Sequence, residues 1–134
     1  MHFIEPGKDA VEAFCKAYPV DKPVVMLNLL RFKAHAAYPD DSPAEPCSGF
    51  DAYSRYGAGV SPLIKAAGGE LVWQGRQSAM LIGPQDKDWH LAAMVRYPSA
   101  GAFLAMLSSA QYQEVSLHRS AALEDSRLIA MEEL

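Results

Sequence analysis

Apolar residues along this chain recur with two different spacings, and the two spacings alternate. Residues 23–32 are apolar at both odd and even positions, which is typical of a strand that is covered on both faces. Residues 70–76 favour a second strand, which we expect to continue toward Met80–Ile82. Residues 90–97 and 126–131 favour a third and a fourth strand.

Between these strands the apolar residues recur every three to four positions, as on one face of a helix. One helix is expected after Ser48 and should end at Gly68-Gly69, because glycine accepts the left-handed backbone of many helix ends. A second helical region should follow Ser99, with an interruption at Ser108-Ser109. The order predicts an α+β fold, a ferredoxin-like βαββαβ sandwich with a four-stranded antiparallel sheet and both helices on one face.

Two segments lie outside this plan. Residues 8–18 predict a short helix before the first strand. Residues 34–48 are rich in proline and acidic side chains and have no periodicity, so this loop should be mobile or ordered only by a partner chain. Whether it acts as a lid stays open.

The first strand creates a problem that the predicted fold does not solve within one chain. Helices cover one face of the sheet, yet residues 23–32 are apolar on both faces, and residues 90–97 are nearly so. An apolar face of that size is unfavourable in water and should meet a second copy. The sequence therefore predicts a homodimer in which two sheets close an α+β barrel around a cavity.

Composition narrows the class of protein. The 134 residues suggest a single domain over 1–134. A net charge of −4 without a basic cluster argues against nucleic acid as a partner. No run approaches the ~20 apolar residues of a membrane span, and the N-terminus does not resemble a signal peptide, so we expect a cytoplasmic protein without a membrane partner.

Two observations argue against a cofactor and a metal. Cys15 and Cys47 fit no metal or redox spacing, and no glycine-rich phosphate loop, paired carboxylate or Ser-His-Asp order stands out. His118 follows Glu114 by four residues, but a solvent-facing pair is the commoner reading and no further ligands are at hand. We therefore expect neither a cofactor nor a metal.

Asn28 is the sharpest candidate for a site residue. It lies in the middle of the first strand among apolar neighbours, where burial disfavours an amide. Its hydrogen-bonding groups must be met by the backbone, by a neighbouring side chain or by a ligand. It either fixes the register of the strand or faces a ligand, and we expect a cavity with Asn28 at its polar end, between the first long helix and the sheet or between two sheets.

Arg119 is the second candidate because it lies in the apolar stripe of the last helix. A buried arginine needs an anion. A structural ion pair with Glu124 or Asp125 is the expected arrangement, and a substrate carboxylate is the alternative.

Four more residues complete the candidate ligand-binding set. Arg31 ends the first strand, where a cation near a cavity mouth would attract an anion. Tyr53, Tyr56 and Trp73 would wall an aromatic pocket or, as the alternative, belong to the plain core or a dimer interface. Catalytic residues are not assigned.

Several stretches together resemble the domain-of-unknown-function family 1330, within the dimeric α+β barrel superfamily. They are Pro23-Val-Val-Met-Leu-Asn-Leu-Leu-Arg-Phe-Lys33, Tyr53-Ser-Arg-Tyr56, Gly68-Gly69, Tyr97-Pro-Ser-Ala-Gly-Ala-Phe103, Tyr112, His118-Arg119, Ala122-Leu123 and Asp125-Ser-Arg-Leu-Ile129. The resemblance implies a homodimer with a ferredoxin-like protomer. The superfamily includes cofactor-free monooxygenases, muconolactone isomerases and haem peroxidases, so it fixes architecture better than chemistry.

Three hypotheses about function follow. The protein is a cofactor-free enzyme, monooxygenase-like or isomerase-like, that acts on a small organic molecule in the barrel cavity. Alternatively it is a non-catalytic homodimer that binds a small molecule or serves a stress response, or a structural dimer without a ligand. A cavity measurement separates the third hypothesis from the other two, and turnover separates the first from the second.

Overall fold

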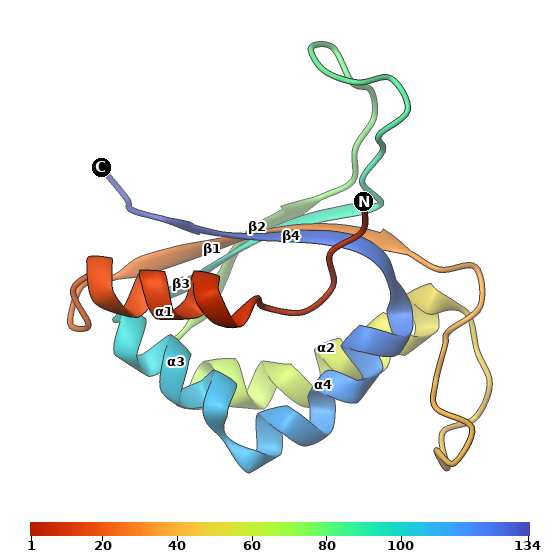
Figure 1. Ribbon diagram of the computed structural model, residues 1–134, viewed down its shortest axis with the longest axis horizontal. Coiled ribbons are helices and arrows are strands. Elements are labelled where there is room, and N and C mark those ends of the chain that lie inside the picture. The colour runs from red at the N-terminus through yellow and green to blue at the C-terminus, as the bar shows by residue number, and fades with distance from the viewer.

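The computed structural model describes residues 1–134, and its sheet has the strand order β2-β3-β1-β4 with every neighbouring pair antiparallel. The elements in chain order are α1 (Lys8–Ala17), β1 (Val24–Phe32), α2 (Gly49–Ala66), β2 (Glu70–Gly75), β3 (Leu91–Tyr97), α3 (Ala100–Ser108), α4 (Ala110–Ala122) and β4 (Leu123–Met131). Helices α2, α3 and α4 lie together beneath one face of the sheet (Figure 1). The predicted α+β ferredoxin-like sandwich is confirmed.

Strand β1 is central, and its alternation divides the sheet into two faces. Met26 is opposite Val95 on β3 and Ala130 on β4, and these residues face the helices. The same face of β1 carries Val24 and Leu30, both almost completely buried. Burial on this face supplies most of the apolar contact that holds the helices on the sheet.

Serine side chains begin three of the helices, and the sequence predicts two of these caps, Ser48 and Ser99. The hydroxyls of Ser48, Ser99 and Ser109 each accept a hydrogen bond from the backbone N–H three residues later, at 3.0 to 3.1 Å. Ser109 is therefore the point where the second helical region divides into α3 and α4. At the crossing of α2 and α4, a side chain at Gly59 would lie 2.1 Å from Val115 Cγ1, so only glycine permits this close approach.

The face of the sheet opposite the helices carries large apolar side chains that no other part of the chain covers. Trp73 is 52% exposed, and Val72, Ile129 and Met131 are each more than 40% exposed. None of the helices is long and apolar enough to cross a membrane.

Strand β2 is shorter than its sequence predicts. It ends at Gly75, and residues 76–90 leave the sheet as an arm that stands away from the helical layer (Figure 1). The expected continuation through Met80–Ile82 is wrong, because no strand lies beside these residues to accept their hydrogen bonds.

The loop over residues 34–48 has more contacts than its sequence suggests. Tyr38 packs on the core beside α4, and its hydroxyl lies 2.7 Å from Nδ1 of His118. The backbone N–H of Ala37 donates to the carbonyl of Ala121 at 2.8 Å. The expectations of a loop without packing and of a solvent-facing His118 are therefore wrong, although the mobility of the loop stays a prediction.

Candidate functional site

A cavity of about 210 Å³ lies between the helical layer and the sheet. All four strands and helices α2, α3 and α4 contribute to a mainly apolar wall. Its polar lining residues are Asn28, Tyr53, Tyr56, Ser61, Gln74, Tyr97, Tyr112 and Arg119. No carboxylate, histidine, cysteine or lysine lines it, and nowhere in the chain are three or more His, Cys, Asp or Glu grouped to hold a metal ion.

Asn28 lies in the sheet wall of this cavity, as predicted. It is opposite Ala93 on one side and Leu128 on the other, and both neighbours also line the cavity. Its amide nitrogen donates one long hydrogen bond of 3.4 Å to the carbonyl of Met26, and its amide oxygen has no partner in the chain. The amide therefore has hydrogen-bonding capacity left for a ligand.

Arg119 reaches the cavity from α4 and is only 8% exposed. Its Nη1 donates a 2.6 Å hydrogen bond to the carbonyl of Ile4, which is its one hydrogen bond, and no carboxylate lies within 4 Å. The predicted ion pair with Glu124 or Asp125 is wrong. Because β4 begins at Leu123, directly after the helix, both acids belong to the strand and pair with other cations.

Tyrosine side chains from α2 and α4 form the polar floor of the cavity. The hydroxyls of Tyr56 and Tyr112 are 3.1 Å apart, and the rings of Tyr53 and Tyr56 pack at a centroid distance of 5.3 Å with their planes tilted by 43°. The hydroxyl of Tyr53 has no hydrogen-bond partner in the chain, so it too is available to a ligand.

Burial decides the protonation of these tyrosines. It raises the pKa of Tyr53 to about 12, while the nearby charge of Arg119 acts in the opposite direction. Burial also raises the pKa of Tyr56, and the neighbouring Tyr112 adds to the shift. Both phenols are therefore neutral at physiological pH and can donate a hydrogen bond to a ligand.

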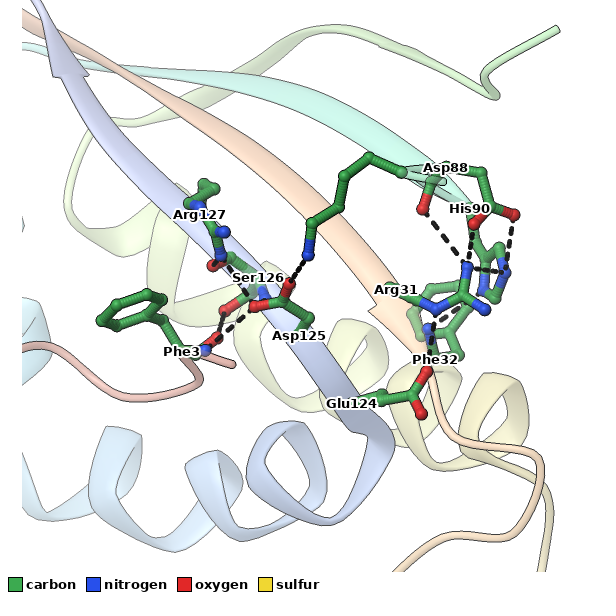
Figure 2. Close-up of polar contacts among 10 residues, drawn as sticks. Phe3, Arg31, Phe32, Asp88, His90, Glu124, Asp125, Ser126 and Arg127 are labelled. Carbon is green, nitrogen blue, oxygen red and sulfur yellow. Dashed lines mark hydrogen bonds and ion pairs between the residues drawn. The ribbon is translucent and has the colours of Figure 1, made fainter. Parts of the chain in front are cut away.

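Arg31 lies outside the cavity, contrary to the predicted wall. Figure 2 shows its guanidinium between Asp88 and Glu124, and its Nε donates to the Glu124 carboxylate at 2.8 Å. It lines a wide surface groove of about 1190 Å³. The two carboxylates already balance its charge, so Arg31 is unsuited to hold an anionic ligand.

Trp73 also lies outside the cavity, on the exposed face of the sheet. The pairing of β2 with β3 shifts register between Leu71 and Trp73, so that Trp73 is opposite Met94 while Leu71 is opposite Val95. The bulge turns Trp73 away from the helices and brings Gln74 into the cavity instead. A strict two-residue period does not reveal this exchange.

Tyr112 is a site residue that the sequence pattern did not single out. Its side chain is buried, lines the cavity and meets Tyr56. Its position seven residues before Arg119, on the same helical stripe, is the signal that would have found it.

The cavity adjoins spaces on two sides. Tyr53 and Gln74 line both the cavity and the surface groove, where the ammonium of Lys33 and the guanidinium of Arg76 have no ion-pair partner. On the other side, Arg119 also lines a second pocket of about 370 Å³ beneath α1 and the N-terminal residues 3–7. Arg119 therefore lies where the two interior spaces meet.

The N-terminal residues that cover this second pocket are fastened to β4. Asp125 is 1% exposed and accepts hydrogen bonds from Phe3 N–H at 2.9 Å, Arg127 Nη1 at 2.7 Å and Lys87 Nζ at 3.1 Å. The hydroxyl of Ser126 donates to the carbonyl of Phe3 (Figure 2). Burial alone would raise the pKa of Asp125, but these hydrogen bonds outweigh it and hold the pKa well below its usual range.

The fold and the cavity define a ferredoxin-like α+β protein with a mainly apolar internal site. The family described as Domain of unknown function (DUF1330) matches residues 49–134, and the chain belongs to this family. A comparison with curated proteins gives no match.

Solved structures agree with this assignment. A protein of unknown function from Rhodopseudomonas palustris is 41% identical, with a TM-score of 0.91 over 100% of this chain and 98% of that one. The hydroxynitrile lyase of Passiflora edulis is 14% identical, with a TM-score of 0.55 over 85% of this chain and 95% of that one. A dimeric protein of unknown function from Bacteroides fragilis is 12% identical, with a TM-score of 0.51 over 83% and 96%. The last two share the fold alone.

Proposed function

We propose that this protein binds a small organic anion in the cavity between the sheet and the helices, with the carboxylate or enolate oxygen of the ligand on Arg119. The observation that carries the proposal is a guanidinium that is 8% exposed, faces the cavity and has no carboxylate partner. A buried cation without a counter-charge is costly, and an anionic ligand would supply the missing charge. The bidentate geometry of the guanidinium suits a carboxylate.

The remaining polar groups support a ligand with a second oxygen. Asn28 has an amide that is nearly free, and Tyr53 has a free hydroxyl. A mainly apolar pocket with few convergent polar groups is the usual form of a small-molecule site. At about 210 Å³ the cavity is smaller than most drug-sized pockets, which favours a short-chain or single-ring acid.

Charge at the cavity mouth also favours an anion. Lys33 and Arg76 line the groove beside Tyr53, and neither takes part in an ion pair. Uncompensated cations beside the cavity raise the local concentration of anions and so speed their entry.

Conversion of the ligand is the second candidate function. A neutral Tyr56 paired with Tyr112 can donate a proton, and Arg119 can stabilise a developing oxyanion, as in cofactor-free isomerases and oxygenases. However, the cavity wall contains no carboxylate or histidine that could act as a base at neutral pH. An enzyme of this kind would need a substrate that arrives already ionised, so we place binding first.

We also propose that the protein is a homodimer. Trp73, Ile129 and Met131 leave the outer face of the sheet apolar and exposed, and burial against a second copy would remove that cost. The Bacteroides fragilis protein of the same fold is described as dimeric, which supports the proposal.

Matched ligands test the proposed site. Isothermal titration calorimetry with benzoate and with its neutral isostere benzamide should give binding of the carboxylate alone. Mass spectrometry of the protein as purified, under native conditions, should identify any retained acid, which then replaces benzoate. Equal affinity for the neutral isostere, or an unchanged benzoate affinity in Arg119→Met, would overturn the proposal. Consumption of the retained acid by the protein would favour the second candidate.

A further inference from the structure

The arm of residues 76–90 ends in an apolar tip that its own chain does not cover. Leu81 is 90% exposed and Ile82 is 96% exposed, and neither belongs to a core cluster. Two adjacent large aliphatic side chains in water are unfavourable, and exposure of this kind marks an interaction surface.

The arm is braced against the sheet, which sets its direction. At its base the Gln77 N–H donates to the Trp89 carbonyl at 3.4 Å, and the Gln77 side chain accepts from the Trp89 N–H at 3.0 Å. The ammonium of Lys87 lies 3.1 Å from Asp125 on β4, and the guanidinium of Arg127 lies 5.3 Å from the Trp89 ring. The arm leads into β3, and β1 lies between β3 and β4 in the sheet. These contacts therefore fix the arm to β4, on the far side of β1.

The arm stands on the side of the sheet that has no helices (Figure 1). The six steps from Arg76 to Ile82 reach at most about 20 Å when extended. Two sheets that pack face to face are separated by about 10 Å. If this sheet packs on the sheet of a second copy, an arm of this length would extend beyond the sheet of the partner. It would therefore contact the partner chain.

We infer that the arm packs against a second copy of this chain and buries Leu81 and Ile82 in the interface. The inference rests on the homodimer proposed above, since the arm and the exposed apolar sheet face lie on the same side. Two-fold symmetry would place each arm on the other protomer, so four large aliphatic side chains would be buried per dimer in addition to the sheets.

The dimer dissociation constant of a Leu81→Ser/Ile82→Ser double variant tests this inference. Sedimentation velocity over a concentration series should show it raised by at least about a hundredfold, because the four side chains lose their burial. The circular dichroism spectrum should not change, since the tip contributes nothing to the core of the protomer. Asp86→Asn, an exposed polar substitution in the same arm, should dissociate like the wild type.

Hydrogen–deuterium exchange gives an independent reading that needs no variant. Amides of residues 79–83 should exchange more slowly above the dissociation constant than below it. The inference would be overturned if the wild type is a dimer, the double variant has the same dissociation constant and the arm shows no protection. The homodimer would then stand, and the tip would be free for a different partner. A wild type that stays monomeric would overturn the arm and the homodimer together, whereas benzoate binding reports on the cavity separately.

Discussion

Arg119 and Ile4 are joined by a hydrogen bond of 2.6 Å from the guanidinium Nη1 to the backbone carbonyl. The bond connects the cavity side of α4 to the N-terminal residues that cover the second pocket. A carbonyl dipole satisfies a donor but leaves the positive charge uncompensated. The charge on Arg119 therefore has no counter-charge within the chain.

Replacement of Arg119 by methionine should separate structure from binding. The variant loses one hydrogen bond to Ile4 but also removes a buried cation, so the free energy of unfolding should change by no more than about 1 kcal/mol. Benzoate affinity should fall by about tenfold to a hundredfold, the usual worth of a charged hydrogen bond. Urea unfolding and calorimetry on the same preparations measure both. A loss of stability of about 3 kcal/mol or more would instead assign Arg119 a structural role.

Asn28→Leu addresses the sheet wall of the same cavity. The amide makes one 3.4 Å hydrogen bond, so its removal gives up little and adds apolar contact. We expect stability equal to or above wild type, together with loss of ligand binding. A less stable protein that still binds benzoate would identify Asn28 as a structural residue that fixes the register of β1. Thermal unfolding with and without benzoate distinguishes these outcomes.

The buried tyrosines predict a distinct alkaline titration. The chain has 6 tyrosines, and burial raises the pKa of Tyr53, Tyr56 and Tyr97. A raised pKa in the folded state means that the contribution of these groups to stability is complete below pH 10 and is lost as the pH rises toward 12. The phenolate absorbance of Tyr53, Tyr56 and Tyr97 should therefore appear only as the protein unfolds at alkaline pH.

A matched variant assigns this absorbance. Tyr53→Phe should remove about one phenolate from the absorbance that appears on alkaline unfolding. Ionisation of all 6 tyrosines while the fold persists would contradict the burial of Tyr53, Tyr56 and Tyr97.

The architecture could be predicted because it follows from periodicities that tolerate local errors. The strand that contains Asn28 is apolar on both faces, and Ser48 and Ser99 mark the starts of two helices, so the order of elements and the antiparallel sheet were accessible from the sequence. Asn28 was also accessible, since one amide among leucines conflicts with its surroundings. Conflicts of this kind are local and need no knowledge of the partner strand.

Features that depend on one residue of register could not be predicted. The bulge after Leu71 moves Trp73 to the outer face, and no property of residues 70–76 signals it. The partner of Arg119 depends on the residue at which α4 ends. The helix ends at Ala122 and β4 begins at Leu123, so Glu124 and Asp125 belong to the strand. Arg31 was misplaced because its two carboxylates come from segments far away in the sequence.

Asp125 predicts how the protein responds to acid. Its pKa is held below the ordinary 3.8 because the hydrogen bonds from Phe3, Arg127 and Lys87 outweigh the effect of burial. A lowered pKa in the folded state means that the stabilisation is present above pH 4 and is lost as the pH falls below it. Asp125→Asn should cost about 3 kcal/mol at pH 7, since it leaves buried donors and a cation unpaired.

The neighbouring Glu124→Gln is the matched control for that experiment. Glu124 pairs with Arg31 at the surface, where both side chains are more than a third exposed, so its loss should cost at most about 1 kcal/mol. Urea unfolding between pH 7 and pH 2.5 should show a steep acid loss for the wild type and Glu124→Gln but a flatter profile for Asp125→Asn. Profiles of equal slope in Asp125→Asn and wild type would show that Asp125 does not govern acid stability. An equal loss of unfolding free energy in the two variants at pH 7 would show that the buried Asp125 contributes no more than the exposed Glu124. In that case Asp125 would not hold the N-terminal residues over the Arg119 side of the cavity.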